Sequence, residues 1–171
     1  PVRRWIKRLS FPTTVSGFMS TGAKAAAFSA FLLVFAHQFE NAEKLTTVLA
    51  ILAAASMILG NIVAIVQSNI KRMLAYSSIA HAGYMLIGLA AGNQFGKSGI
   101  IFYLTSYMFM NIGAFGILSL LEREGEKNLT FDDYAGLGNK KPFLAAMMSI
   151  FMLSLAGIPP FGGFFGKYYI F

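Results

Sequence analysis

The stretch Leu153–Tyr169 reads LSLAGIPPFGGFFGKYY and places two adjacent prolines inside an apolar segment. The surrounding run, 142–171, is long enough to cross a membrane as a helix. Pro159 and Pro160 prevent this, because each lacks a backbone N–H group and its ring collides with a carbonyl of the preceding turn. Gly157 loosens the backbone just before them. We therefore expect a discontinuous membrane helix, with the break in contact with protein or water rather than lipid.

Lys167 is the only charged residue of this run, and it lies just beyond the break. An interrupted membrane helix with an ionisable residue beside the interruption is typical of ion-transport sites. A second lysine, Lys24, lies about twelve residues from either end of another apolar segment, too deep to reach the interface. All seven acidic residues lie in predicted loops, so neither lysine has a carboxylate partner within a span. Such lysines either bind and release protons or pair with a neighbouring helix for structure alone.

The composition indicates a polytopic, all-α integral membrane protein. The 171 residues are 56% hydrophobic and only 12% charged, about half the charged share of a typical soluble domain. The absence of cysteine excludes disulfides, Cys-ligated zinc, iron–sulfur ligation and thiol catalysis. A net charge of +7 would suggest nucleic-acid binding in a soluble protein. Here the basic residues lie in short loops, where they set membrane topology, so no nucleic-acid partner is expected.

Five apolar segments have lengths near the ~20 residues that a helix needs to span a bilayer. No soluble domain interrupts them, so residues 1–171 are predicted to form a single transmembrane unit, a helix bundle with one discontinuous helix. The chain starts without Met and stops inside a hydrophobic run, so we expect a fragment of a longer protein. The predicted spans are 13–36, 45–66, 74–92, 98–121 and 142–171.

The distribution of basic residues predicts the orientation. Ten Lys and Arg residues lie on one side of the predicted bundle, against Lys44 and Lys97 on the other. Without the N-terminal arm that precedes Pro12, the count is six against two. The positive-inside rule therefore makes the first side cytoplasmic. The six residues are Lys71 and Arg72 in the second loop, and Arg123, Lys127, Lys140 and Lys141 in the fourth.

The third and fourth spans add polar side chains. His81 has Ser77 four residues before it and Tyr84 three residues after it, which places all three on one helix face. Histidine titrates near neutral pH and can relay protons, although it can equally bind a carbonyl of a neighbouring helix. In the fourth span, Asn111 needs a polar partner, and bonding to another helix is favoured over lining a hydrated path. It shares a face with Tyr103, Ser106 and Tyr107.

Two long stretches and one short one carry a family resemblance. They read KRMLAYSSIAHAGY (Lys71–Tyr84), LSLAGIPPFGGFFGK (Leu153–Lys167) and TGAK (Thr21–Lys24). They resemble the antiporter-like, proton-pumping subunits of respiratory complex I, the NADH:quinone oxidoreductase, and are most similar to its N-type subunit and the mitochondrial and plastid relatives of that subunit. The resemblance runs from about Pro12 to Phe171.

The resemblance implies a fold of about fourteen helices with two inverted five-helix repeats. This sequence would match helices eight to twelve, with the twelfth discontinuous. Lys24 matches the central lysine of the eighth helix, and Lys167 matches the lysine of the broken helix near the exit half-channel. His81 and Tyr84 fall in the tenth-helix motif. The first repeat of the family, which this sequence lacks, holds the glutamate and lysine that would supply counter-charges.

The resemblance also implies a proton-translocating subunit that carries protons and performs no redox step. NADH, FMN, quinone and iron–sulfur clusters would then bind to other subunits, and none is expected in this chain. The expected partners are other membrane subunits of complex I and the lipid bilayer. We expect the bacterial inner membrane, with an organellar inner or thylakoid membrane as the alternative.

Two alternatives stay open. The chain could belong to a multi-subunit cation/proton antiporter or a membrane-bound hydrogenase with the same fold, or it could be a non-conducting scaffold whose lysines only hold helices together. For the proton carrier, we expect Lys24, His81 and Lys167 to share an interior route at mid-membrane depth. The predicted supporting residues are Tyr84, Ser77, Tyr107 and Asn111, and the predicted break contains Gly157, Pro159 and Pro160.

Overall fold

The computed structural model describes residues 12–35, 43–122 and 129–171. Within these ranges four helices are long and apolar enough to cross a membrane, and a fifth apolar helix is shorter. The predicted all-α transmembrane bundle is therefore confirmed. The helices are α2 (Thr13–Phe35), α3 (Glu43–Ile65), α4 (Ile70–Ala90), α5 (Gln94–Leu121), η2 (Asp132–Tyr134), α6 (Leu137–Lys140), α7 (Pro142–Ala156) and α8 (Gly162–Ile170).

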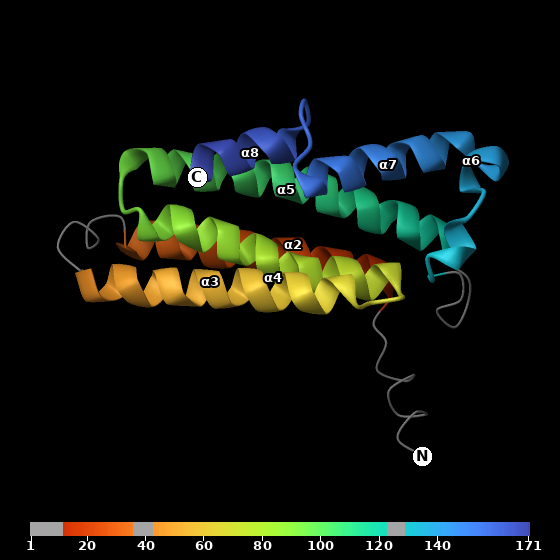
Figure 1. The fold of residues 1–171 in the computed structure, drawn as a ribbon. Helices are drawn as coiled ribbons and strands as arrows, with labels where there is room; N and C mark the ends of the chain where they lie inside the picture. Colours follow the sequence, from red (N-terminus) through yellow and green to blue (C-terminus); the bar gives the residue numbers. More distant parts are fainter. Residues whose placement is uncertain (1–11, 36–42, 123–128) are drawn as a thin grey trace, which may run out of the picture.

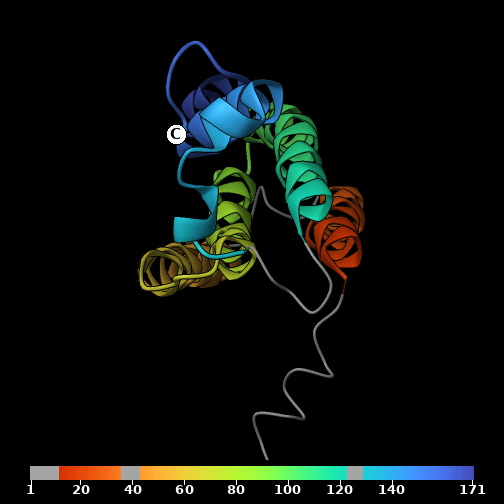
Figure 2. The same cartoon turned by 90° about the vertical axis from the view of Figure 1, so that its right-hand side faces the viewer.

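The long helices run alternately up and down along one axis (Figure 1). The view along that axis shows α4 between α2 and α3, with α5 and the α7–α8 pair on the other side (Figure 2). Helix α5 contacts α2, α4, α7 and α8, so it is the central element of the bundle. Helix α3 packs chiefly against α4 and leaves most of its apolar surface exposed, as expected for a helix that faces lipid or further protein.

The basic residues separate between the two ends of this bundle. Lys71 and Arg72 lie at the start of α4, at the same end as α6 and its Lys140, whereas Lys97 lies at the opposite end, at the start of α5 (Figure 1). The N-terminal arm, Arg123 and Lys127 lie outside the described residues. The cytoplasmic assignment of the first end stays a prediction.

Helix α4 begins at Ile70, four residues before the predicted apolar segment. Asn69 causes the early start, because its extended backbone and its side-chain oxygen, which accepts from the N–H of Arg72, form an N-cap. Lys71 consequently lies in the first helical turn and not in a loop. It is buried, and its Nζ lies 4.0 Å from the carboxylate of Glu122 at the end of α5.

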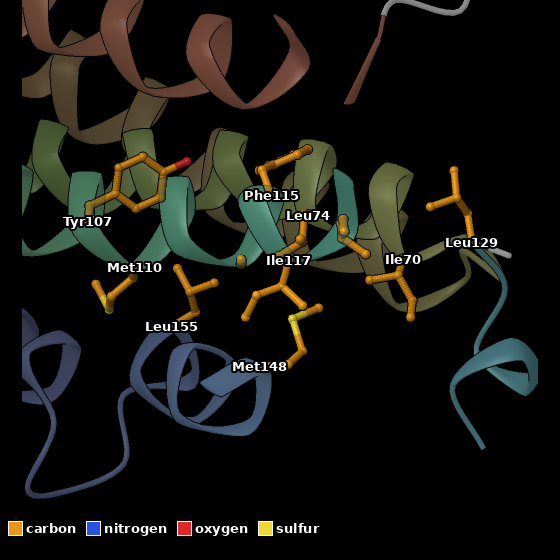
Figure 3. Close-up of a cluster of buried hydrophobic side chains, with 11 residues drawn as sticks. Ile70, Leu74, Tyr107, Met110, Phe115, Ile117, Leu129, Met148 and Leu155 are labelled. Carbon is orange, nitrogen blue, oxygen red and sulfur yellow. The ribbon is translucent and has the colours of Figure 1, made fainter. Parts of the chain in front are cut away.

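One core cluster fills the space between α4, α5, α7 and the segment that begins at Leu129 (Figure 3). That segment returns to the start of α4, where the N–H of Ile70 donates to the carbonyl of Leu129 at 2.8 Å. The side chain of Leu129 is fully buried, so it closes this end of the core. The cluster contains Ile70, Leu74, Tyr107, Met110, Ala114, Phe115, Ile117, Leu118, Leu129, Met148 and Leu155.

The discontinuous helix is present as predicted. Helix α7 ends at Ala156. The next residue, Gly157, has a φ of 86°, in the left-handed region that favours glycine, and the chain becomes helical again at Gly162. The segment between them, with Pro159 and Pro160 joined by a cis peptide bond, projects away from the bundle (Figure 1). Both prolines are exposed within the described chain. Their contact with further protein or water therefore stays a prediction.

The two halves of the broken helix are joined by a buried serine that the sequence analysis did not select. The hydroxyl of Ser154 in α7 accepts a hydrogen bond from the N–H of Gly163 in α8 at 3.2 Å and lies 2.7 Å from the sulfur of Met110 in α5. Gly163 packs so closely that a Cβ at this position would overlap the carbonyl oxygen of Ser154. Only a residue without a side chain fits here.

We expect Gly163→Ala to destabilise the full-length protein by about 1–3 kcal/mol, since the added methyl group overpacks the contact between α7 and α8. Thermal denaturation and the amount of intact protein on a native gel measure this effect. Gly116→Ala in α5 is the matched control, because a Cβ there meets nothing within 4 Å. Equal stability of the two variants would contradict the packing described here.

Candidate functional site

Lys24 points into the bundle. It lies in the middle of α2 and is half-buried, and its Nζ donates to the hydroxyl of Tyr107 in α5 at 3.5 Å. The same nitrogen lies 5.3 Å from the centre of the Tyr107 ring, within the range of a cation–π interaction. Lys24 therefore does contact a neighbouring helix, through a neutral tyrosine and not through a carboxylate.

His81 lies at the centre of a group of tyrosines. It is buried on α4, and its Nδ1 forms a hydrogen bond with the hydroxyl of Tyr103 in α5. The centre of the Tyr107 ring lies 5.0 Å from the centre of the imidazole. The centre of the Tyr84 ring lies 5.5 Å from it, with the two rings edge to face. Tyr103 was not among the predicted site residues. Its position four residues before Tyr107, on the polar face of the same helix, is the sequence signal that pointed to it.

Lys167 is held by the end of α7. Its Nζ donates to the carbonyls of Leu155 and Ala156, at 3.1 Å each. In an unbroken helix these carbonyls would accept from the residues four positions later, which are Pro159 and Pro160 and have no N–H group. The ammonium group of Lys167 supplies the missing donors, at the helix end where a positive charge is favoured.

The structure brings the three predicted relay residues together through two tyrosine rings. The Nζ of Lys167 lies 5.1 Å from the centre of the Tyr84 ring, and Tyr84 contacts His81. On the other side of His81, Tyr107 contacts both the imidazole and Lys24. A continuous series of contacts thus runs from α2 through α5 and α4 to α8. Among the described residues, no carboxylate forms an ion pair with either lysine.

A cavity of about 350 Å³ opens beside this series, between α3, α4, α7 and α8. A water molecule occupies ~30 Å³ in the liquid, so the space suffices for several of them. Ser77 lines the cavity, and its hydroxyl donates to the carbonyl of Leu74 at 2.9 Å. The polar lining residues are Asn61, Ser77, His81, Tyr84 and Lys167.

Asn111 forms a hydrogen bond to a neighbouring helix. It is buried on α5, and its Nδ2 donates to the hydroxyl of Ser20 in α2 at 2.6 Å. Ser20 lies one helical turn before Lys24, so this bond fixes α2 against α5 next to the lysine. Asn111 does not line the cavity.

The side chains of this site suit proton transfer better than metal binding. They are two lysines, one histidine and three tyrosines. Within the described residues, no group of three or more histidine and acidic side chains lies close enough together to hold a metal ion.

Residues 1–171 match the family model described as NADH:quinone oxidoreductase/Mrp antiporter, TM. The chain belongs to this family. It is 53% identical over 161 residues to NADH-quinone oxidoreductase subunit N 1 of Solibacter usitatus, a match that covers 94% of this chain and 33% of that protein. Subunit N of Trichlorobacter lovleyi is 54% identical over 161 residues, with the same coverage. The chain thus spans about a third of the length of these relatives.

The fold of this family member is found in a solved respiratory complex. Respiratory complex I from Thermus thermophilus with bound aureothin contains a chain that is 42% identical, with a TM-score of 0.76, over 93% of this chain and 34% of that one. The similarity drawn from the sequence motifs is therefore confirmed, as is the antiporter-like fold. The protein is an integral membrane protein.

We expect Lys167→Met to lower the stability of the full-length protein, because the carbonyls of Leu155 and Ala156 lose their donors. The cost of unsatisfied polar groups of this kind is about 1–3 kcal/mol. Lys167→Arg keeps two donors at the same place and should retain most of that stability. The midpoint of thermal denaturation in detergent measures both variants, and a methionine variant as stable as the arginine variant would contradict the capping role.

Proposed function

We propose that this chain is part of a proton-translocating membrane subunit of an NADH:quinone oxidoreductase, in which Lys24, His81 and Lys167 relay protons. The observation that carries the proposal is the series of contacts that links these residues beside a cavity large enough for water. The names of the similar relatives support the assignment to this enzyme complex.

The surroundings of the ammonium groups of Lys24 and Lys167 allow a proton to leave. A tyrosine ring stabilises the positive charge of each group, and main-chain carbonyls also stabilise that of Lys167, without the strong Coulomb attraction that a carboxylate would add. A proton on either lysine is therefore not fixed there by an ion pair within the described residues. Positive charges on Lys24, His81 and Lys167 repel one another, so the arrival of a proton at one residue favours release from another.

We propose that the energy for transport comes from outside this chain. Moving one charge against 100 mV requires about 2.3 kcal/mol, which a redox reaction elsewhere in the complex would supply. We infer that NADH, FMN, iron–sulfur clusters and quinone act in other subunits, and that other membrane subunits of complex I are the partners of the intact protein. The bacterial origin of the relatives supports a bacterial inner membrane.

The alternatives receive less support. The family description also includes Mrp antiporters, but relatives at 53% and 54% identity carry the name of the oxidoreductase subunit. A scaffold that only holds helices together has no need for a cavity beside His81 and Lys167. Lys24 would also serve a scaffold better with a carboxylate partner than with the face of a tyrosine.

Lys24→Ala in the intact complex should lower both proton pumping and the coupled quinone-reductase rate, with assembly retained. Lys24→Arg should impair pumping as well, because guanidinium does not release its proton at physiological pH. A lysine that only holds helices together should tolerate arginine in large part. The measurements are proton uptake and quinone-linked NADH oxidation in vesicles, with complex content checked on a native gel.

The matched control is Lys140→Arg, because Lys140 is exposed on α6 and lies outside the long helices. Lys71 is unsuitable as a control, since it is buried and lies next to Glu122. If Lys24→Arg pumps protons at the rate of the unmodified complex, the relay role of Lys24 is wrong.

A further inference from the structure

The two ring nitrogens of His81 face different surroundings. Nδ1 is bound to the hydroxyl of Tyr103, a fully buried residue that does not line the cavity. Nε2 has no hydrogen-bond partner among the described residues, and His81 forms part of the cavity wall. Because Nδ1 is already bound, Nε2 is the nitrogen left free to exchange a proton with water that enters the cavity.

The hydroxyl of Tyr103 has one hydrogen, and its partner within the described residues is Nδ1 of His81. If this hydrogen points elsewhere, a buried donor is left without an acceptor, which lowers the population of that arrangement by roughly five- to hundredfold. Neutral His81 consequently accepts at Nδ1 and carries its own hydrogen on Nε2. In this tautomer Nε2, the nitrogen without a protein partner, has no lone pair to receive a further proton.

We propose that Tyr103 is a positioning residue that keeps His81 in the tautomer unable to take a proton from the cavity. The inference rests on the proposed function, since it requires His81 to lie on the proton route. In the other tautomer, Nδ1 carries the hydrogen and donates it to the oxygen of Tyr103. Nε2 then accepts a proton from a hydronium ion in the cavity and leaves water behind. Tyr103 thus opposes passive proton flow through the resting protein.

The position of Tyr103 is coupled to the broken helix. Gly166 in α8 lies against the Tyr103 ring so closely that a Cβ at residue 166 would overlap the ring. The next residue is Lys167, whose ammonium group holds the end of α7. If a change in the protonation of Lys167 displaces α8, the Tyr103 ring loses its support and its hydrogen bond to His81 can break. The protonation state of Lys167 can therefore change the tautomer of His81.

Tyr103→Phe in the full-length chain, assembled in the intact complex, tests the proposal. The variant keeps the ring and removes the hydroxyl hydrogen, so passive proton conductance of vesicles without NADH should rise roughly five- to hundredfold. Adding His81→Gln to Tyr103→Phe should return the conductance to that of the unmodified complex, since glutamine does not take up protons. Tyr76→Phe, on the exposed face of α4, is the matched control and should leave the conductance unchanged.

An unchanged conductance in Tyr103→Phe overturns the proposal, and so does a conductance that stays high in the double variant, because a packing defect would then be the cause. If Tyr103→Phe does not assemble, Gly166→Ala, which displaces the ring instead, should raise the conductance in the same His81-dependent way. Loss of pumping in His81→Gln together with no increase in Tyr103→Phe leaves the proposed function standing and this inference wrong. Normal pumping in His81→Gln contradicts the proposed function itself.

Discussion

The arrangement of α7 and α8 follows from two backbone carbonyls that have no hydrogen-bond donor within their own helix. Pro159 and Pro160 cannot donate to Leu155 and Ala156, and a free carbonyl at membrane depth is costly. The ammonium group of Lys167 reaches back from α8 to satisfy both. The same contact positions the charge beside Tyr84, on the wall of the cavity. One interaction therefore closes the helix break and places a half-buried ionisable group beside it.

The tyrosines explain how the chain holds positive charge in an apolar bundle. The faces of Tyr107 and Tyr84 lie near Lys24 and Lys167, and each of these rings also contacts His81. A ring face attracts a cation by its quadrupole and does not neutralise it. The charges remain able to influence one another across the bundle, as a relay requires. A carboxylate in the same place would fix the proton more firmly.

Close packing transmits these arrangements between helices. Gly163 in α8 allows the backbone of α7 to approach, and Asn111 ties α5 to α2 beside Lys24 through Ser20. The central position of α5 is important, because it presents polar groups to α2 and α4 and supports both halves of the broken helix. A shift of either half can therefore reach His81 through side chains already in contact, without unfolding any helix.

Composition and local backbone geometry were enough to predict an all-α membrane bundle, the break at the two prolines, and the positions of Lys24 and Lys167 within apolar segments. Helical spacing also placed Ser77, His81 and Tyr84 on one face. It could not show which helix that face meets, because periodicity contains no information on packing partners. The packed helices show that His81 bonds to Tyr103, that Lys167 donates to carbonyls of α7, and that Lys71 lies beside Glu122. The sequence alone could not predict these contacts, because each joins segments that meet only when the helices pack.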